Sequence, residues 1–205
     1  MGYVGAGGEA LQPGGGQVAR MSTFAKAYYE QLRQALDTID LAKVEQVIQW
    51  FDEAREQDKQ IFVCGNGGSS STASHFVTEV LKGASHGRSK RFRILALNDS
   101  MATITAYAND AGYECVFAEQ LKNFAQPGDL VMGLSSSGNS PNVLRALEYA
   151  NSIGCRTLAL TGRGGGKLGP LAQLALQVGE THTGRIEDAH MAICHMISYY
   201  FMESK

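Results

Sequence analysis

The sequence predicts an α/β fold in which a doubly wound parallel sheet of five strands carries helices on both faces. Short apolar segments typical of buried strands alternate with helical segments along most of the chain. Loops rich in glycine and serine follow several of these strands, where folds of this class bind ligands. The 205 residues, 44% apolar and 19% charged, are enough for one well-packed domain.

Two amphipathic helices are expected before the first strand. Residues 1–20 are rich in glycine and are predicted to be a flexible tail, a helix is expected from Ser22, and a second helix covers about 40–57. The apolar positions of this hairpin, residues 22–57, exceed what one face of a sheet requires. We therefore expect part of the hairpin to pack against another subunit, and we treat residues 21–205 as a single domain.

The strands and later helices follow in regular order. Strands are expected at 61–64, 92–97, 129–134, 156–161 and 174–178. A helix follows the first strand, a short helix is capped by residues 98–100, and further helices are expected at 113–125, 140–153 and 184–203. Pro141 suits the first turn of the helix at 140–153.

Charge and cysteine content argue against several classes of function. A formal net charge of −2 provides no basic surface for nucleic acid or an anionic membrane. The cysteines at positions 64, 115, 155 and 194 lie far apart, as is typical of reduced cysteines in a cytosolic protein. No apolar stretch is long enough to span a membrane, and no signal peptide pattern is present. We therefore expect a cytoplasmic protein.

The segment IFVCGNGGSSSTASHFVTE, residues 61–79, contains the first candidate site. Its glycines permit left-handed turns after the strand, and its serines supply hydroxyl groups where a helix begins. Free N–H groups and the positive end of the helix dipole at such a point attract an anion, most often a phosphate. His75 and Glu79 share one face of that helix and can supply a base and a ligand. The alternative is a tight turn followed by a buried His–Glu pair.

A second candidate site is the segment SSSGNS at 135–140, where another helix begins. The hydroxyls of Ser135, Ser136, Ser137 and Ser140 can surround a phosphate without a lysine. A capping loop rich in serine is the alternative. The loop GRGGGKLG at 162–169 is not a P-loop, because a leucine follows its lysine where Ser or Thr is required. The segment GNGGSS at 65–70 lacks the spacing of a dinucleotide-binding motif.

The last helix contributes further acid–base groups. Glu187 and His195 are eight residues apart, slightly more than two turns, and lie roughly on the same side. If this helix meets the helix of His75 and Glu79 across a cleft, the four side chains could hold a divalent metal or act as an acid–base pair. His182 lies in a polar segment and is interpreted as a surface residue.

Four segments in this order resemble the phosphoheptose isomerases of the sugar isomerase (SIS) domain family, from about Ser22 to the end of the chain. They are CGNGGSSSTASHFVTE, LSSSGNSPNVLRAL, TGRGGGKL and RIEDAHMAICH. The resemblance implies a three-layer αβα fold with flavodoxin-like winding and a homotetramer with active sites between subunits. It also implies interconversion of sedoheptulose 7-phosphate and D-glycero-D-manno-heptose 7-phosphate through an enediol.

The resemblance also assigns roles to individual residues. Glu79 would be the catalytic base and His195 the acid, and a bound Zn²⁺ would use His75, Glu79, Glu187 and His195. The four serines at 135–137 and 140 would hold the phosphate, and the sugar chain would contact Asn66, Gly67, Ser69, Asp99 and Glu187. Two positions depart from the family pattern: Glu187 stands where Gln is usual, and Gly184 stands where Asp is expected.

Three alternatives remain open at this point. A non-catalytic SIS protein, which binds a phosphosugar as a signal or assembles on a replication initiator, would share the fold but lack the active-site pair that this chain retains in Glu79 and His195. An SIS isomerase of a hexose or pentose phosphate would carry the same motifs. We favour a zinc ion with Glu187 among its ligands. Without metal, like-charge repulsion between Glu187 and Glu79 would instead raise the pKa of one of these two carboxyl groups.

Overall fold

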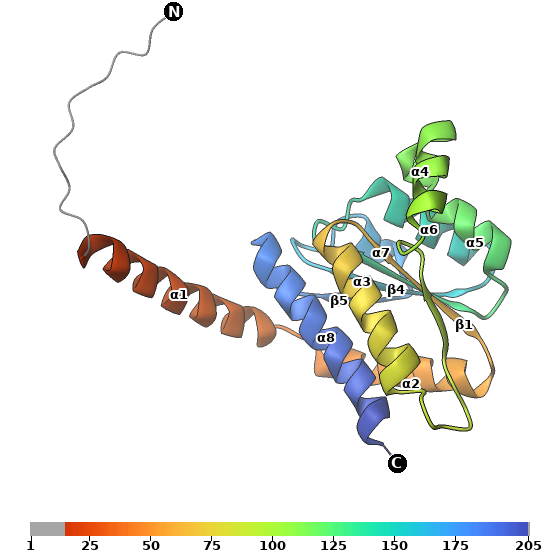
Figure 1. Ribbon diagram of the computed structural model, residues 1–205, viewed down its shortest axis with the longest axis horizontal. Helices are drawn as coiled ribbons and strands as arrows, with labels where there is room; N and C mark the ends of the chain where they lie inside the picture. The colour runs from red at the N-terminus through yellow and green to blue at the C-terminus, as the bar shows by residue number, and fades with distance from the viewer. Residues whose placement is uncertain (1–14, 205) are drawn as a thin grey trace, which may run out of the picture.

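The computed structural model describes residues 15–204, which form one parallel sheet with helices on both faces (Figure 1). The strands, in chain order, are β1 (Gln60–Gly65), β2 (Arg93–Ala96), β3 (Leu130–Ser135), β4 (Arg156–Thr161) and β5 (Leu174–Gln177). Their order in the sheet is β2-β1-β3-β4-β5, and every pair is parallel. This is flavodoxin-like winding, with its switch point between β1 and β3. The predicted fold class is confirmed.

Helices cover the two faces of the sheet in separate layers. Residues of α2 (Leu41–Glu56), α3 (Gly68–Thr78) and α8 (Thr183–Glu203) pack with one set of strand residues. Residues of α5 (Ala118–Phe124), α6 (Pro141–Ser152) and the short α7 (Leu168–Leu171) pack with the other set, and α4 (Met101–Asp110) lies beside them. The protein therefore has the three αβα layers that the resemblance implies.

Alternate residues of each strand supply the two cores. Ile61 and Val63 of β1 face the core under α2, α3 and α8, whereas Phe62 and Cys64 face the core under α5 and α6. All four side chains are completely buried. A parallel strand between two helical layers is buried on both faces, so its sequence is a continuous apolar run. That run is why β1 and β4 could be predicted to within a residue.

The first helix differs from its prediction. Helix α1 spans Gly15–Leu36, so it begins seven residues before Ser22, and residues 15–20 continue this helix instead of forming a tail. The tail prediction for residues 1–14 lies outside the described residues. Figure 1 shows α1 projecting from the body of the molecule, with its last turns near α8. Its side chains Met21, Phe24 and Tyr29 are largely exposed.

Two further segments depart from the sequence prediction. Residues 113–125 are not one helix but a 3₁₀ turn at Tyr113–Cys115 followed by α5, because residues 115–117 turn into the core and are buried there. After α3 the chain continues as one π-helical segment, Glu79–Gly83, in which Glu79 is the first residue. Such segments occur often at functional sites. No helix within residues 15–204 is both long and apolar enough to cross a membrane.

Candidate active site

The carboxyl ends of β1, β3 and β4 border a cavity of about 210 Å³. It lies at the switch point of the sheet, where doubly wound folds bind ligands. The residues that line it come from the loops after these strands and from the start of α8; they are Asn66, Ser69, Leu134, Ser135, Ser136, Ser137, Ser140, Arg163, Thr183 and Glu187. The two glycine- and serine-rich segments therefore meet in one place.

The serine loop gives the cavity its hydroxyl groups. The Oγ atoms of Ser135 and Ser140 are 3.0 Å apart, and those of Ser135 and Ser137 are 3.4 Å apart. The Oγ atom of Ser136 is buried and has no hydrogen-bond partner among the described residues. A buried hydroxyl without a partner costs roughly 1–3 kcal/mol, and an acceptor placed in the cavity would remove that cost. The loop is thus suited to an anion with several oxygen atoms.

Three helices begin at the cavity. Ser69 lies in the first turn of α3, Ser140 is the N-cap residue of α6, and Thr183 is the first residue of α8. The positive ends of three helix dipoles therefore point toward the same space. Each favours a negative charge there, and their unpaired N–H groups can donate to it.

Glycines in the loops after β3 and β4 allow these two loops to pack backbone against backbone. A Cβ atom at Gly138 would overlap the carbonyl oxygen of Gly165, and one at Gly166 would lie 2.5 Å from the carbonyl oxygen of Ser137. The N–H of Leu168 donates to the carbonyl of Gly138 at 2.9 Å. The 162–166 loop thus supports the serine loop from behind, which explains its glycine content without a nucleotide.

Asn66 is held in a defined orientation at the edge of the cavity. Its Nδ2 donates to Oδ1 of Asn142 at 2.8 Å, and its Oδ1 accepts from Nδ2 of Asn142 and from the hydroxyl of Tyr113, both at 2.9 Å. An amide nitrogen carries two hydrogens, so one remains available to a ligand. Asn142 and Tyr113 were not predicted as site residues from the sequence: Asn142 stands in the segment LSSSGNSPNVLRAL but was given no role there, and Tyr113 lies outside the four motif segments.

Glu187 enters the cavity from α8. Its carboxylate lies against Gly68, where a Cβ atom would overlap it, so this position of α3 requires glycine. Burial raises the pKa of Glu187, and the neighbouring charge of Asp188 raises it further.

His75 and His195 come together on the neighbouring helices α3 and α8, which Figure 1 shows side by side. Their Nε2 atoms are 3.0 Å apart and their rings meet edge to face. His75 is exposed, and His195 and Glu79 are half-buried. These three side chains lie outside the lining of the serine cavity. Apart from Gly67 and Asp99, the predicted residues thus form two groups, one in the cavity and one along the seam where α3 and the segment after it pack against α8.

Asp99 and Gly67 also lie outside the lining of the cavity. Asp99 is exposed and accepts a hydrogen bond from Ser74 of α3, whose Oγ accepts in turn from Nδ2 of Asn98 at 2.8 Å. Gly67 has a φ of 55° and is the N-cap residue of α3, so it shapes the turn that presents Ser69. The free N–H groups beyond it are the part of this turn that a ligand can use.

The predicted zinc ligands are only partly assembled. His75 and His195 direct two imidazole nitrogens toward each other, and nitrogen ligands suit zinc. Within residues 15–204, however, no three His, Cys, Asp or Glu side chains gather into a group that could hold a metal. The donor types fit the ion, whereas Glu79 and Glu187 do not join the two histidines in this structure.

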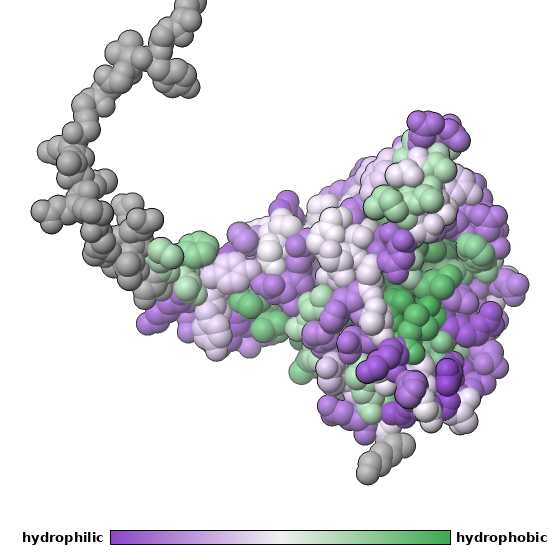
Figure 2. Space-filling view, viewed as in Figure 1, coloured by the Kyte–Doolittle hydropathy of each residue, from purple (hydrophilic) through white to green (hydrophobic). Residues whose placement is uncertain are grey.

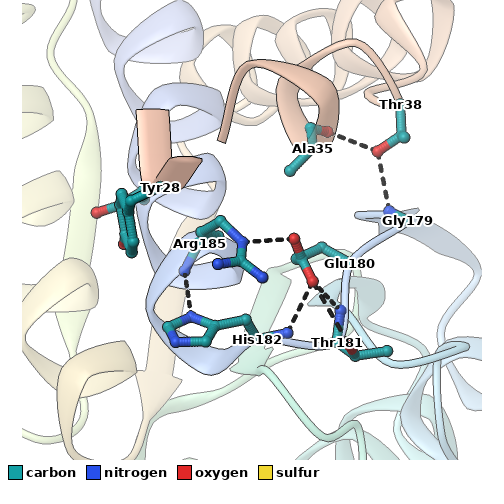
Figure 3. Close-up of polar contacts among 9 residues, drawn as sticks. Tyr28, Ala35, Thr38, Gly179, Glu180, Thr181, His182 and Arg185 are labelled. Carbon is teal, nitrogen blue, oxygen red and sulfur yellow. Dashed lines mark hydrogen bonds and ion pairs between the residues drawn. The ribbon is translucent and has the colours of Figure 1, made fainter. Parts of the chain in front are cut away.

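A cluster of polar contacts fixes the start of α8 (Figure 3). The carboxylate of Glu180 accepts from Nε of Arg185 at 2.6 Å and from the N–H groups of Thr181 and His182, and the bond from Arg185 is the main reason its pKa falls to about 2. His182, which is exposed as predicted, also caps α8 by accepting from the N–H of Arg185. Thr183 and Glu187 are therefore presented from a rigid helix end.

Helix α1 reaches the same cluster. The hydroxyl of Tyr28 donates to Asp188 at 2.6 Å, and the guanidinium of Arg185 lies over the Tyr28 ring. A Cβ atom at Gly184 would lie 3.2 Å from that hydroxyl, tighter than most real contacts. The glycine at 184, where the family pattern has Asp, therefore leaves room for Tyr28.

Arg163 and Thr183 line the cavity but were not among the predicted site residues. The guanidinium of Arg163 donates to the hydroxyl of Thr183. Position 163 follows β4 at the same edge of the sheet as the two predicted loops. Its place just after a strand is the sequence feature that could have identified Arg163 as a site residue.

Comparison with known proteins places the chain in a family. The family model of the SIS domain matches residues 24–162. A probable phosphoheptose isomerase of Thermoplasma volcanium is 40% identical over 178 residues, which cover 84% of this chain and 90% of that protein. The structures of phosphoheptose isomerases from Neisseria gonorrhoeae and Francisella tularensis superpose with TM-scores of 0.80 and 0.83 at 29% and 27% identity. These superpositions cover 92% and 90% of this chain, and 99% of each isomerase. The chain therefore belongs to the SIS domain family, and because phosphoheptose isomerases match most of its length, it is an isomerase of sugar phosphates.

Proposed function

We propose that the protein interconverts sedoheptulose 7-phosphate and D-glycero-D-manno-heptose 7-phosphate. The observation that carries this proposal is the cavity, where three helix N-termini and the buried, unpartnered hydroxyl of Ser136 meet. Such a site suits a phosphate group. The names of the relatives supply the heptose.

The substrate would extend from the cavity along the seam between α3 and α8. His75 is six residues after Ser69, which corresponds to about 9 Å along α3 at the usual rise per residue. An extended seven-carbon chain has a comparable length. With its phosphate among the serines, such a substrate could present its first two carbons to Glu79 and His195. Binding energy from the phosphate would then orient the carbons that react.

In the proposed reaction, Glu79 is the base and His195 the acid. The carboxylate of Glu79 removes a proton from C1 of the ketose while His195 protonates the carbonyl oxygen at C2, and a cis-enediol forms. Glu79 then returns its proton to C2 as His195 takes the proton from the oxygen on C1, which leaves the aldehyde. The backbone N–H of Glu79 still donates to the carbonyl of His75 four residues before it, so Glu79 keeps the regular spacing of α3 although the π-helical segment begins there. A carboxylate and an imidazole are suitable groups for this proton transfer.

We also propose that Zn²⁺ binds His75 and His195, with Glu79 and Glu187 as carboxylate ligands. The facing Nε2 atoms of the two histidines support this assignment. When bound, the ion would have a structural or orienting role toward these side chains, because a glutamate tied to zinc is a poorer base.

Self-association as a tetramer is proposed from two exposed apolar surfaces. One is the face of α1 with Phe24 and Tyr29, which are 71% and 63% exposed. The other is a groove of about 500 Å³ beside the edge strand β2, lined by apolar side chains that include Leu81, Leu95 and Phe124. Figure 2 shows hydrophobic surface gathered on this side of the molecule. Apolar surfaces of this kind mark protein interfaces. A cytoplasmic location is proposed from the four cysteines, all free and buried.

Product analysis by NMR tests the proposed function. The purified protein is incubated separately with sedoheptulose 7-phosphate and fructose 6-phosphate, and Glu79→Gln serves as the matched control. Formation of the aldoheptose phosphate by the wild-type protein alone supports the proposal. Turnover of the hexose phosphate without turnover of the heptose phosphate would assign the enzyme to another sugar.

A further inference from the structure

Arg163 has an unusual backbone conformation. It begins a run of four residues with positive φ, at 47°, 80°, 87° and 55°, and the other three, residues 164–166, are glycines. Within residues 15–204, Asp58 is the only other residue with a side chain that has positive φ, at 55°. Glycine adopts this conformation without the steric penalty that a side chain brings. A strained residue kept among glycines indicates a role for its side chain.

That side chain lines the serine cavity. Its guanidinium donates to the hydroxyl of Thr183, and its backbone N–H donates to the carbonyl of Glu180 at 2.9 Å. Glu180 is itself held by an ion pair with Arg185 in the cluster of Figure 3. Arg163 is thus attached at both ends to the rigid start of α8. A guanidinium carries five N–H donors, so several remain for a ligand.

Arg163 also changes the charge of the cavity. Among the ten lining residues it is the only cation, and Glu187 is the only carboxylate. A phosphate ester carries between one and two negative charges near neutral pH. Hydroxyls and helix ends offer only partial positive charges to such a group, whereas a guanidinium forms paired, charge-assisted hydrogen bonds with phosphate oxygens.

We propose that Arg163 binds the phosphate group of the substrate together with the serine loop and selects phosphorylated sugars over neutral ones. This inference rests on the proposed function of the cavity. Because the phosphate is remote from the reacting carbons, Arg163 acts in substrate binding and not in proton transfer. The left-handed backbone conformation at residue 163 orients the side chain toward the cavity. The steric strain of a positive φ accompanies that orientation.

Two glycine variants separate this role from a structural one. Arg163→Gly and Asp58→Gly remove the same backbone strain, but Asp58 lies at the amino end of the sheet beside β1. Both variants should fold, with melting temperatures equal to or above that of the wild-type protein. Arg163→Gly should raise KM for the sugar phosphate by about 10-fold to 100-fold, chiefly without loss of kcat, and Asp58→Gly should leave KM unchanged. Arg163→Lys, which keeps the charge without the planar fork, should lie between them.

A binding measurement separates this inference from the proposed function. Inorganic phosphate is titrated into the wild-type protein and into both glycine variants by calorimetry. Weaker phosphate binding by Arg163→Gly alone supports the inference even if the wild-type protein does not turn over the heptose phosphate, which would contradict only the proposed function. Equal phosphate affinity and equal KM in Arg163→Gly and the wild-type protein would overturn the inference.

Discussion

His190 should make the stability of the folded protein depend on pH. The side chain lies on α8 and is completely buried, and neither ring nitrogen has a hydrogen-bond partner among the described residues. Burial lowers its pKa from 6.5 to about 4, and the nearby backbone of Thr161 opposes that shift. The folded protein therefore holds a neutral imidazole where the unfolded chain would be protonated.

The sign and size of the effect follow from proton linkage. Between pH 6.5 and about 4 the unfolded chain binds more protons than the folded protein, so the contribution of His190 is complete above pH 6.5 and is lost as the pH falls through this window. At about 1.4 kcal/mol per pKa unit, the limit is about 3 kcal/mol. Between pH 7 and pH 5, the free energy of unfolding should fall by about 2 kcal/mol.

Urea unfolding followed by circular dichroism at pH 7, 6 and 5 measures this loss, at one fixed protein concentration. His190→Leu cannot be protonated and should abolish about 2 kcal/mol of the pH dependence. Its stability at pH 7 should equal or exceed that of the wild-type protein, because it removes two unpartnered polar atoms from the core. His86→Leu removes an exposed imidazole and serves as the control.

Other carboxyl groups do not imitate this result. The lowered pKa of Glu180, about 2, costs stability only as the pH falls below about 4.5, under the window of His190. The raised pKa of Glu187 acts in the opposite direction, since it favours folding at low pH. Both effects are present in the wild-type protein and the variant, so they cancel in the difference. If His190→Leu keeps the wild-type pH dependence, the argument from burial is refuted.

Three further predictions concern the site and its assembly. Glu79→Gln keeps the shape of the side chain but removes the base, so kcat should fall by about 100-fold or more in the NMR assay with the melting temperature unchanged; wild-type turnover would remove Glu79 from the mechanism. The purified protein should contain zinc by elemental analysis, and Glu187→Gln should retain less after dialysis, because the neutral amide attracts the ion less. The zinc prediction would be contradicted if the protein is purified without metal and a chelator changes neither its melting temperature nor its turnover. Phe24→Glu should lower the molar mass in light scattering together with turnover, and a fully active smaller species would show that the site needs one chain only.

Much of the fold was predictable because local pattern and tertiary environment agree. Strand β4 has the predicted bounds, 156–161, since a strand buried on both faces is a continuous apolar run. Helix α1 was harder, because the glycine in residues 15–20 disfavours a helix locally, whereas adding turns to an existing helix costs little. The hairpin at 22–57 was predicted to carry surplus apolar surface, part of it for another subunit, yet Val44 and Phe51 of α2 pack in the chain's own core. The exposed apolar surface of the hairpin belongs to α1.

The site was predictable wherever a polar residue directly follows a strand. The serines and Asn66 do so, and parallel strands end at one edge of the sheet, so their side chains share the cavity. The spacing of residues along one helix predicts that they share a face, but it does not predict their distance from side chains on another helix. Thus His75 and His195 meet, whereas Glu79 and Glu187 do not join them. Arg163 depends on a positive φ, which no apolar pattern encodes.

The separation of the two groups of site residues has a physical consequence. A carboxylate base and an imidazole acid work best where water is excluded, because water screens the charges that develop during proton transfer. In the single chain, however, His75 is exposed, and Glu79 and His195 are only half-buried. If Glu79 and His195 act as proposed, we expect another surface to cover the seam between α3 and α8 during the reaction. Helix α1 projects from the same molecule with Phe24 and Tyr29 exposed, and a second copy of this helix has the apolar surface to exclude water from such a seam. That requirement links assembly to turnover, and it is why Phe24→Glu should reduce both.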